Sequence, residues 1–266
     1  MGNVREPLSI FFYMCAPVVS GVLQREFQAG LPACNYCIHI SDNGLIYLSD
    51  ADYGFVNVFK LDGNFVRKME LPGIRYIRSI SSDPSSSTLF VADSLRVKEF
   101  SSDGSFVKNF GASYCEVSAL EYDPNDQILF IGDLQKIEAR AFKTGELIHS
   151  FPPGRGALNG LETMHFDRIS RLLHVYHGFD RITTFKTDGT EVSSFELPFT
   201  RPSHRVSSFC SYAGLLFLIG VTGVWVVDSA GQVVHRWGNS APRGIAEHDG
   251  LIYTTDTSSN WVRVFI

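Results

Sequence analysis

The sequence predicts an all-β protein made of repeats of about 42 residues. The first observation is a glycine turn that follows one apolar segment and precedes another. It recurs at Ser20-Gly21, Asp62-Gly63, Asp103-Gly104, Thr144-Gly145, Asp188-Gly189 and Ala230-Gly231. Glycine suits such turns because it adopts positive φ without strain. The second observation is that each interval contains several short strand-like segments and no long amphipathic helix. A repeat of this length and content is typical of a β-propeller.

The second strand of each repeat is its most apolar segment. Near-continuous apolar runs indicate strands that are covered on both faces, as happens when each blade of a propeller lies between two others. These segments are Leu45–Asp50, Leu89–Asp93, Ile128–Asp133, Leu172–Tyr176, Leu215–Ile219 and Leu251–Asp256. Six segments of this kind predict six blades.

The third strand of each repeat alternates more between polar and apolar residues. The six third strands are expected at Val56–Phe59, Arg96–Phe100, Ile137–Phe142, Arg181–Phe185, Val224–Val227 and Trp261–Phe265. An inner strand precedes the second and third strands, and an outer strand follows the glycine turn. Each repeat therefore predicts a four-stranded antiparallel blade.

The sixth repeat ends at Ile266 with its third strand, so its outer strand is missing from the C-terminal end. The segment Val22–Phe27 has the spacing of that missing strand. We expect it to join the C-terminal blade, which closes the ring and removes two open sheet edges. The predicted organisation is a lead-in segment over residues 1–21 and a single six-bladed propeller over residues 22–266.

Composition and targeting signals restrict the functional class. The net charge of −5 and the pI of about 5.9 disfavour nucleic-acid binding, which needs a basic face. The apolar run from Leu8 to Leu23 resembles the core of a signal peptide. It is interrupted by Pro17 and Gly21, and its second half fits the repeat. We therefore expect an intracellular protein without a membrane span, with secretion as the alternative.

Cysteine usage predicts neither a disulfide framework nor a zinc site. Five cysteines are scattered along the chain, and only Cys34 and Cys37 form a close pair. A zinc site would need a second pair or histidines at ligand spacing.

The stretch Pro242–Asp256 reads PRGIAEHDGLIYTTD. It resembles the repeat of NHL-type propellers, in which a P-x-G-I-A pattern precedes a G-x-I-Y-V-x-D strand. Parts of the pattern recur near Pro84 and Pro124, and the resemblance extends from Val22 to Ile266. It departs at Tyr176-His177 and Ile219-Gly220, where other repeats carry an acidic residue. The resemblance implies a six-bladed propeller, but such propellers include protein-binding domains, RNA-binding domains, lyases and hydrolases, so it does not select a function.

Alignment of the inner strands places His39, Ser81, Glu121, His165, Cys210 and Ala246 at equivalent positions. His39, Glu121, His165 and Cys210 offer nitrogen, oxygen and sulfur ligands that could surround a divalent metal near the axis. A metal-dependent lyase or hydrolase with its site in the channel is therefore one alternative function. The other interpretation is that these side chains pack between blades or bond to channel water, in which case no cofactor is needed.

Acidic residues end the second strand in four repeats. They are Asp50, Asp93, Asp133 and Asp256. Their recurrence favours a structural role, because aspartate at a strand end accepts hydrogen bonds from loop amides.

Arginine and aromatic residues gather near the loops that enter the inner strands, a composition typical of interaction hot spots. The candidate partner-binding residues are Tyr36, Arg75, Tyr114, Arg155, Arg201, His204, Arg205 and Arg243. No catalytic motif occurs in the chain. We therefore predict a non-catalytic propeller that binds a protein on this loop face or serves as a subunit of a larger complex. RNA binding through the same residues is a second alternative, disfavoured by the net charge.

Overall fold

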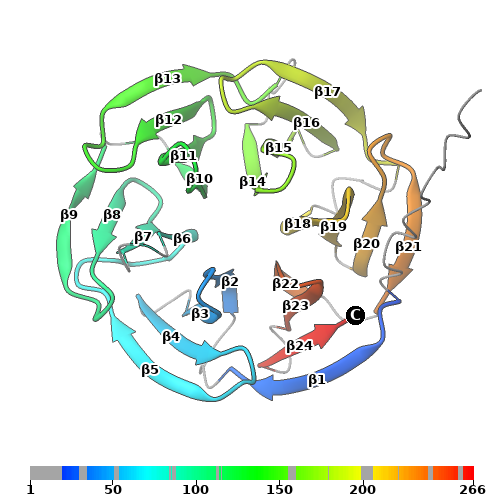
Figure 1. The fold of residues 1–266 in the computed structure, drawn as a ribbon, viewed down its shortest axis with the longest axis horizontal. Coiled ribbons are helices and arrows are strands. Elements are labelled where there is room, and N and C mark those ends of the chain that lie inside the picture. The colour runs from blue at the N-terminus through cyan, green and yellow to red at the C-terminus, as the bar shows by residue number, and fades with distance from the viewer. Residues whose placement is uncertain are drawn as a thin grey trace, which may run out of the picture.

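The computed structural model is a ring of six four-stranded antiparallel sheets (Figure 1). It describes residues 20–29, 35–50, 54–83, 85, 88–111, 114, 116–154, 160–178, 180–198, 206–220, 222–238, 242–256 and 260–266. The predicted six-bladed propeller is confirmed. Among these residues, no helix is long and apolar enough to cross a membrane.

Each blade has the same four strands, ordered from the axis to the rim (Figure 1). The inner strands are β2 (Asn35–Ile40), β6 (Ser79–Asp83), β10 (Val117–Asp123), β14 (Leu161–Asp167), β18 (Ser208–Tyr212) and β22 (Pro242–His248). The second strands are β3 (Leu45–Asp50), β7 (Thr88–Ala92), β11 (Ile128–Asp133), β15 (Leu172–His177), β19 (Leu215–Gly220) and β23 (Leu251–Asp256). The second strands therefore match their predicted positions to within one residue at either end.

The outer half of each blade completes the sheet. The third strands are β4 (Phe55–Lys60), β8 (Val97–Phe100), β12 (Ile137–Ala141), β16 (Arg181–Lys186), β20 (Gly223–Val227) and β24 (Trp261–Phe265). The outer strands are β5 (Phe65–Glu70), β9 (Phe106–Phe110), β13 (Leu147–Phe151), β17 (Glu191–Glu196), β21 (Val233–Trp237) and β1 (Leu23–Gln28). We number the blades 1 to 6 in the order of their inner strands.

The two ends of the described chain share blade 6, as predicted. β1 pairs antiparallel with β24, with Phe27 opposite Val262. The backbone N–H of Val22 donates to the carbonyl of Ile266 at 3.3 Å, and the N–H of Ile266 donates back at 3.2 Å. The N-terminal strand therefore covers an edge of β24 that would otherwise be open.

The hydrophobic core consists of layers between neighbouring blades. One layer packs Val56 and Val58 of blade 1 against Ile80 and Leu89 of blade 2. The second strands are buried on both faces, and Phe90 and Leu48 are fully buried. This explains why they are continuously apolar instead of alternating.

The recurring glycine has two structural reasons. Gly63 and Gly189 have φ of +88° and +84°, a conformation that favours glycine. In addition, a Cβ at Gly63 would lie 2.7 Å from the ring of Phe27, and one at Gly189 would lie 2.7 Å from the ring of Phe151. Both rings belong to the outer strand of the preceding blade. The turn therefore also marks where consecutive blades touch at the rim.

The strand-end aspartates have the structural role that their recurrence predicts, where their side chains are described. The Asp93 carboxylate accepts the backbone N–H of Leu95 at 2.9 Å, and Asp133 accepts that of Gln135 at 2.8 Å. The Asp256 carboxylate pairs with Arg263 of the adjacent strand at 2.7 Å. The side chain of Asp50 lies outside the described part.

Candidate functional site

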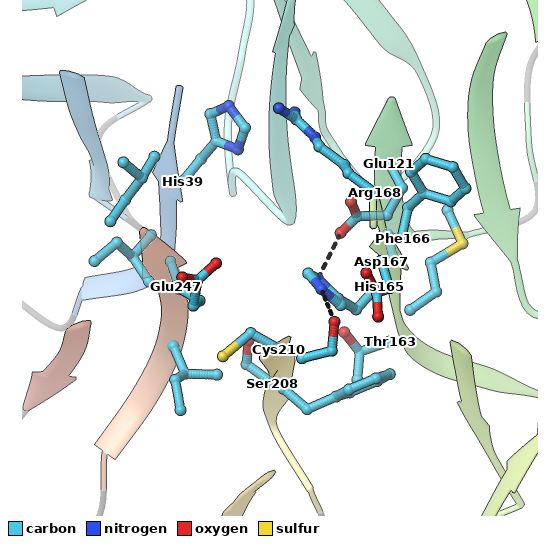
Figure 2. Close-up of a pocket in the computed structure, with 18 of the residues that line it drawn as sticks. His39, Glu121, Thr163, His165, Phe166, Asp167, Arg168, Ser208, Cys210 and Glu247 are labelled. Carbon is cyan, nitrogen blue, oxygen red and sulfur yellow. Dashed lines mark hydrogen bonds and ion pairs between the residues drawn. The ribbon is translucent and has the colours of Figure 1, made fainter. Parts of the chain in front are cut away.

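The inner strands surround a channel along the ring axis with a cavity of about 790 Å³. Its lining runs from Arg78, Ser118 and Glu162, near the starts of the inner strands, to Asp42 and Arg168, in the turns that follow them. Figure 2 shows His39, Glu121, His165 and Cys210 around this space.

The alignment of the inner strands predicted from sequence is confirmed by the strand register. His39, Glu121, His165 and Cys210 each lie opposite the third residue of the second strand. The opposing residues are Tyr47, Phe130, His174 and Phe217, respectively. All four candidates therefore occupy the same level of the channel.

Two of these residues hydrogen-bond to the next blade. The Nε2 atom of His39 lies 2.7 Å from the hydroxyl of Ser82, and that of His165 lies 3.0 Å from the hydroxyl of Ser211. Burial lowers the pKa of each imidazole to about 3, so both are neutral near pH 7. The His39–Ser82 and His165–Ser211 contacts link blades 1 and 2 and blades 4 and 5.

Glu121 is a half-buried carboxyl in the channel wall. Its carboxylate lies 3.9 Å from Nδ1 of His165, and its side chain is 26% exposed. Burial raises the pKa of Glu121 to about 8, and a hydrogen bond from the backbone N–H of Phe166 opposes this shift. The carboxyl is therefore mainly protonated at neutral pH.

His165 connects a carboxyl to a hydroxyl, because its Nδ1 faces Glu121 and its Nε2 contacts Ser211. This order resembles the relay that activates a serine nucleophile. The electrostatics oppose that role, because a neutral carboxyl does not stabilise an imidazolium and an imidazole with a pKa of about 3 is a weak base. The His39–Ser82 pair repeats the same bond, and no carboxylate of the described residues forms an ion pair with His39. Packing between blades accounts for both pairs.

The four candidate metal ligands are brought to one level, but their described contacts are to protein groups. Burial raises the pKa of Cys210 well above its ordinary value, so its thiol is protonated. Burial likewise raises the pKa of Cys37, which also lines the channel, to about 12. Among the described residues, no group of three or more histidine, cysteine, aspartate or glutamate side chains is arranged to hold a metal ion. A channel metal stays a prediction.

An ion pair crosses the mouth of the channel. Arg168 follows β14 of blade 4 and pairs with Asp42, which follows β2 of blade 1. Blades 1 and 4 lie opposite each other in the ring (Figure 1). Sequence reasoning missed this pair, although both residues stand three positions after an aligned histidine, His165 and His39.

The predicted partner-binding residues are only partly brought together. Arg75 and Arg243 are exposed. Tyr114 is buried, and its hydroxyl lies 3.2 Å from a carboxylate oxygen of Glu138. Its ring packs in the core between blades 2 and 3, and its role in partner binding stays a prediction. The side chains of Tyr36, Arg155, Arg201, His204 and Arg205 lie outside the described part.

Sequence reasoning also overlooked the rim, where exposed apolar side chains recur at the start of the outer strands. They are Val22 and Leu23, Phe65 and Val66, Phe106 and Val107, Leu147 and Ile148, Val192, and Val233 and Val234. Their spacing after each glycine turn was the available signal.

Fold and channel together define the protein as a six-bladed β-propeller with a mixed polar and apolar channel. A scan of known protein-family models finds no match, and a search of curated proteins finds none either. The likeness to NHL repeats therefore stays a prediction from the sequence.

Proposed function

We propose that this chain is a non-catalytic protein-interaction propeller that binds an extended segment of a partner protein along β13. The observation that carries the proposal is the composition of this strand. β13 reads Leu-Ile-His-Ser-Phe and is the one outer strand among the six described without Asp, Glu, Lys or Arg.

Charged residues on an edge strand discourage pairing with another chain. The other outer strands carry Arg25 and Glu26, Arg67, Lys68 and Glu70, Lys108, Glu191 and Glu196, and Arg236. β13 lacks this protection and therefore differs from the outer strands of the other five repeats. We expect a specific function at a position where the repeats differ.

The geometry of β13 fits the addition of a strand. It lies on the circumference (Figure 1) and pairs with β12 but with no further strand of the described chain. Its outer edge therefore offers backbone donors and acceptors. Leu147 and Ile148 are 50% and 51% exposed and point to opposite faces of the sheet. A partner segment with apolar side chains would bury both.

The test begins with a photo-crosslinking amino acid at Ile148 in the full-length protein, incubated with native extract. The matched control carries it at Val107, the equivalent position of β9, where Lys108 follows. We expect one protein to be crosslinked from Ile148 and not from Val107. Mass spectrometry then identifies the crosslinked partner. Adding the purified partner should slow amide hydrogen exchange over Leu147–Phe151 of this chain.

A gatekeeper substitution completes the test. Ile148→Lys should weaken binding of the identified protein at least tenfold while leaving the thermal unfolding transition in place, whereas Val107→Lys should not weaken it. Equal crosslinking at both sites, or a reconstituted complex with unchanged exchange at β13, would overturn the proposal. Binding on the loop face, the channel enzyme and RNA binding stay predictions.

A further inference from the structure

We propose, independently of β13, that one part of the loop face binds an acidic segment of a partner protein that also carries apolar side chains. This part, the blade 2–3 surface, consists of Arg75, Tyr76, Leu95, Arg96 and Leu134. These residues lie in the β5–β6 connection and in the β7–β8 and β11–β12 turns, which emerge on the same face of the ring. Sequence reasoning singled out only Arg75 among them.

Contacts between loops hold the blade 2–3 surface together. The backbone N–H of Arg78, in the β5–β6 connection, donates to the carbonyl at the end of β7 at 2.9 Å. The N–H of Tyr114 donates to the carbonyl of Leu95 at 3.0 Å. The Tyr114 hydroxyl lies 3.2 Å from Glu138, whose carboxylate pairs with Lys136 of the β11–β12 turn at 2.6 Å. The connection and the two turns therefore form one continuous surface.

Three apolar side chains of this surface face solvent. Tyr76, Leu95 and Leu134 are 60%, 55% and 37% exposed. Tyr76 also has a φ of +60°, which is strained for an aromatic residue. The other five described non-glycine residues with positive φ lie in turns within a blade, whereas Tyr76 lies in a connection between blades. Strain of this kind is typical of residues that the fold presents for function.

The charges of the surface favour an acidic partner. Arg75 and Arg96 are exposed, and neither forms an ion pair within the described part of the chain. The nearby carboxylates have other partners. Asp93 accepts two N–H groups of its own turn at 2.9 and 2.8 Å, and Glu116 pairs with Arg78 at 3.1 Å. Unpaired arginines in a protein of net charge −5 therefore offer local complementarity to carboxylates.

A protein segment fits this surface better than RNA does. Of its three exposed apolar side chains, only Tyr76 is aromatic and can stack on a base. Leu95 and Leu134 are aliphatic and suit the apolar side chains of a peptide. The net charge of −5 also opposes the phosphates of a nucleic acid. Arginine beside tyrosine is a composition enriched in the hot spots of protein interfaces.

The test selects peptides of about twelve residues from a random library on the full-length protein. Peptides that also bind the Arg75→Ala, Arg96→Ala double variant are removed, which excludes binders of β13 and of the channel. We expect the remaining peptides to carry several Asp or Glu residues beside Leu or an aromatic residue. By fluorescence anisotropy, one such peptide should bind about fivefold more weakly at 300 mM than at 50 mM salt, because salt screens exposed charges.

Single substitutions test the apolar part of the surface. Leu95→Ser and Tyr76→Gly should each weaken this peptide about threefold or more. Tyr76→Gly should not lower the thermal unfolding midpoint, because glycine adopts positive φ without strain. Two matched controls lie on the opposite face, Ile169→Ser in the β14–β15 turn and Lys186→Ala at the end of β16, and neither should change the affinity. Both replaced side chains are exposed.

Four outcomes would each overturn the proposal. They are enrichment of peptides without acidic residues, loss of every peptide in the counter-selection, unchanged affinity in Leu95→Ser and Tyr76→Gly, and tighter binding of a single-stranded RNA of mixed sequence than of the peptide. The last outcome would assign the surface to RNA. None of them depends on a partner at β13.

Discussion

Replacing Glu121 by glutamine should remove a loss of stability that the protein suffers as the pH rises. The pKa of this carboxyl is about 8 in the folded protein, against an ordinary value of 4.5. Between these two values the folded protein holds a proton that the unfolded chain has released. The free energy of unfolding therefore falls as the pH rises through this window.

One pKa unit corresponds to about 1.4 kcal/mol, so the loss between pH 6.5 and pH 8.5 is about 2 kcal/mol. Urea unfolding of the wild type and of Glu121→Gln across this range would measure it. We expect the wild type to lose this amount and the variant to stay nearly level. Glu70→Gln, whose glutamate side chain is 85% exposed, should follow the wild type. Parallel pH profiles for the wild type and Glu121→Gln would refute the reasoning.

Two further predictions concern the rim and the mouth. Gly189→Ala should destabilise the protein by about 1–3 kcal/mol more than Gly178→Ala in urea unfolding, because only at Gly189 would the new methyl meet a ring, that of Phe151. Both glycines have positive φ, so equal losses would show that backbone strain alone explains the turn. Arg168→Met should raise the pKa of His39 in an NMR titration, since burial and then the Arg168 charge lower it. In this variant the pKa of His39 should still remain below 6.5, because burial is unchanged. An unchanged pKa would show that the arginine charge does not affect this imidazole.

The candidate channel residues could be aligned from the sequence because each belongs to the same position of a local repeat. The shared level of His39, Glu121, His165 and Cys210 follows from counting along inner strands of nearly equal length. Their bonding partners could not be derived in this way. Ser82 and Ser211 lie in the next blade, and the distances to them depend on how far neighbouring sheets rotate about the axis.

Tyr114 shows the limit of reading exposure from sequence. An aromatic residue near a loop suits a binding face and a core equally, and only the packing of blades 2 and 3 places it inside. The exposure of the edge of β13 also depends on tertiary packing. Its apolar pair is visible in the sequence, but whether another strand covers it depends on the whole ring.

The sequence by itself determined the number of blades, the position of the second strands and the closure of the ring through Val22–Phe27. These features depend on contiguous apolar segments and glycine turns, which are local properties of the chain. The tertiary structure alone decided that Arg168 meets Asp42 across the channel and that Glu121 faces the cavity beside a neutral imidazole. Such relations join residues of different blades, and their distances and protonation states are set by ring curvature and burial.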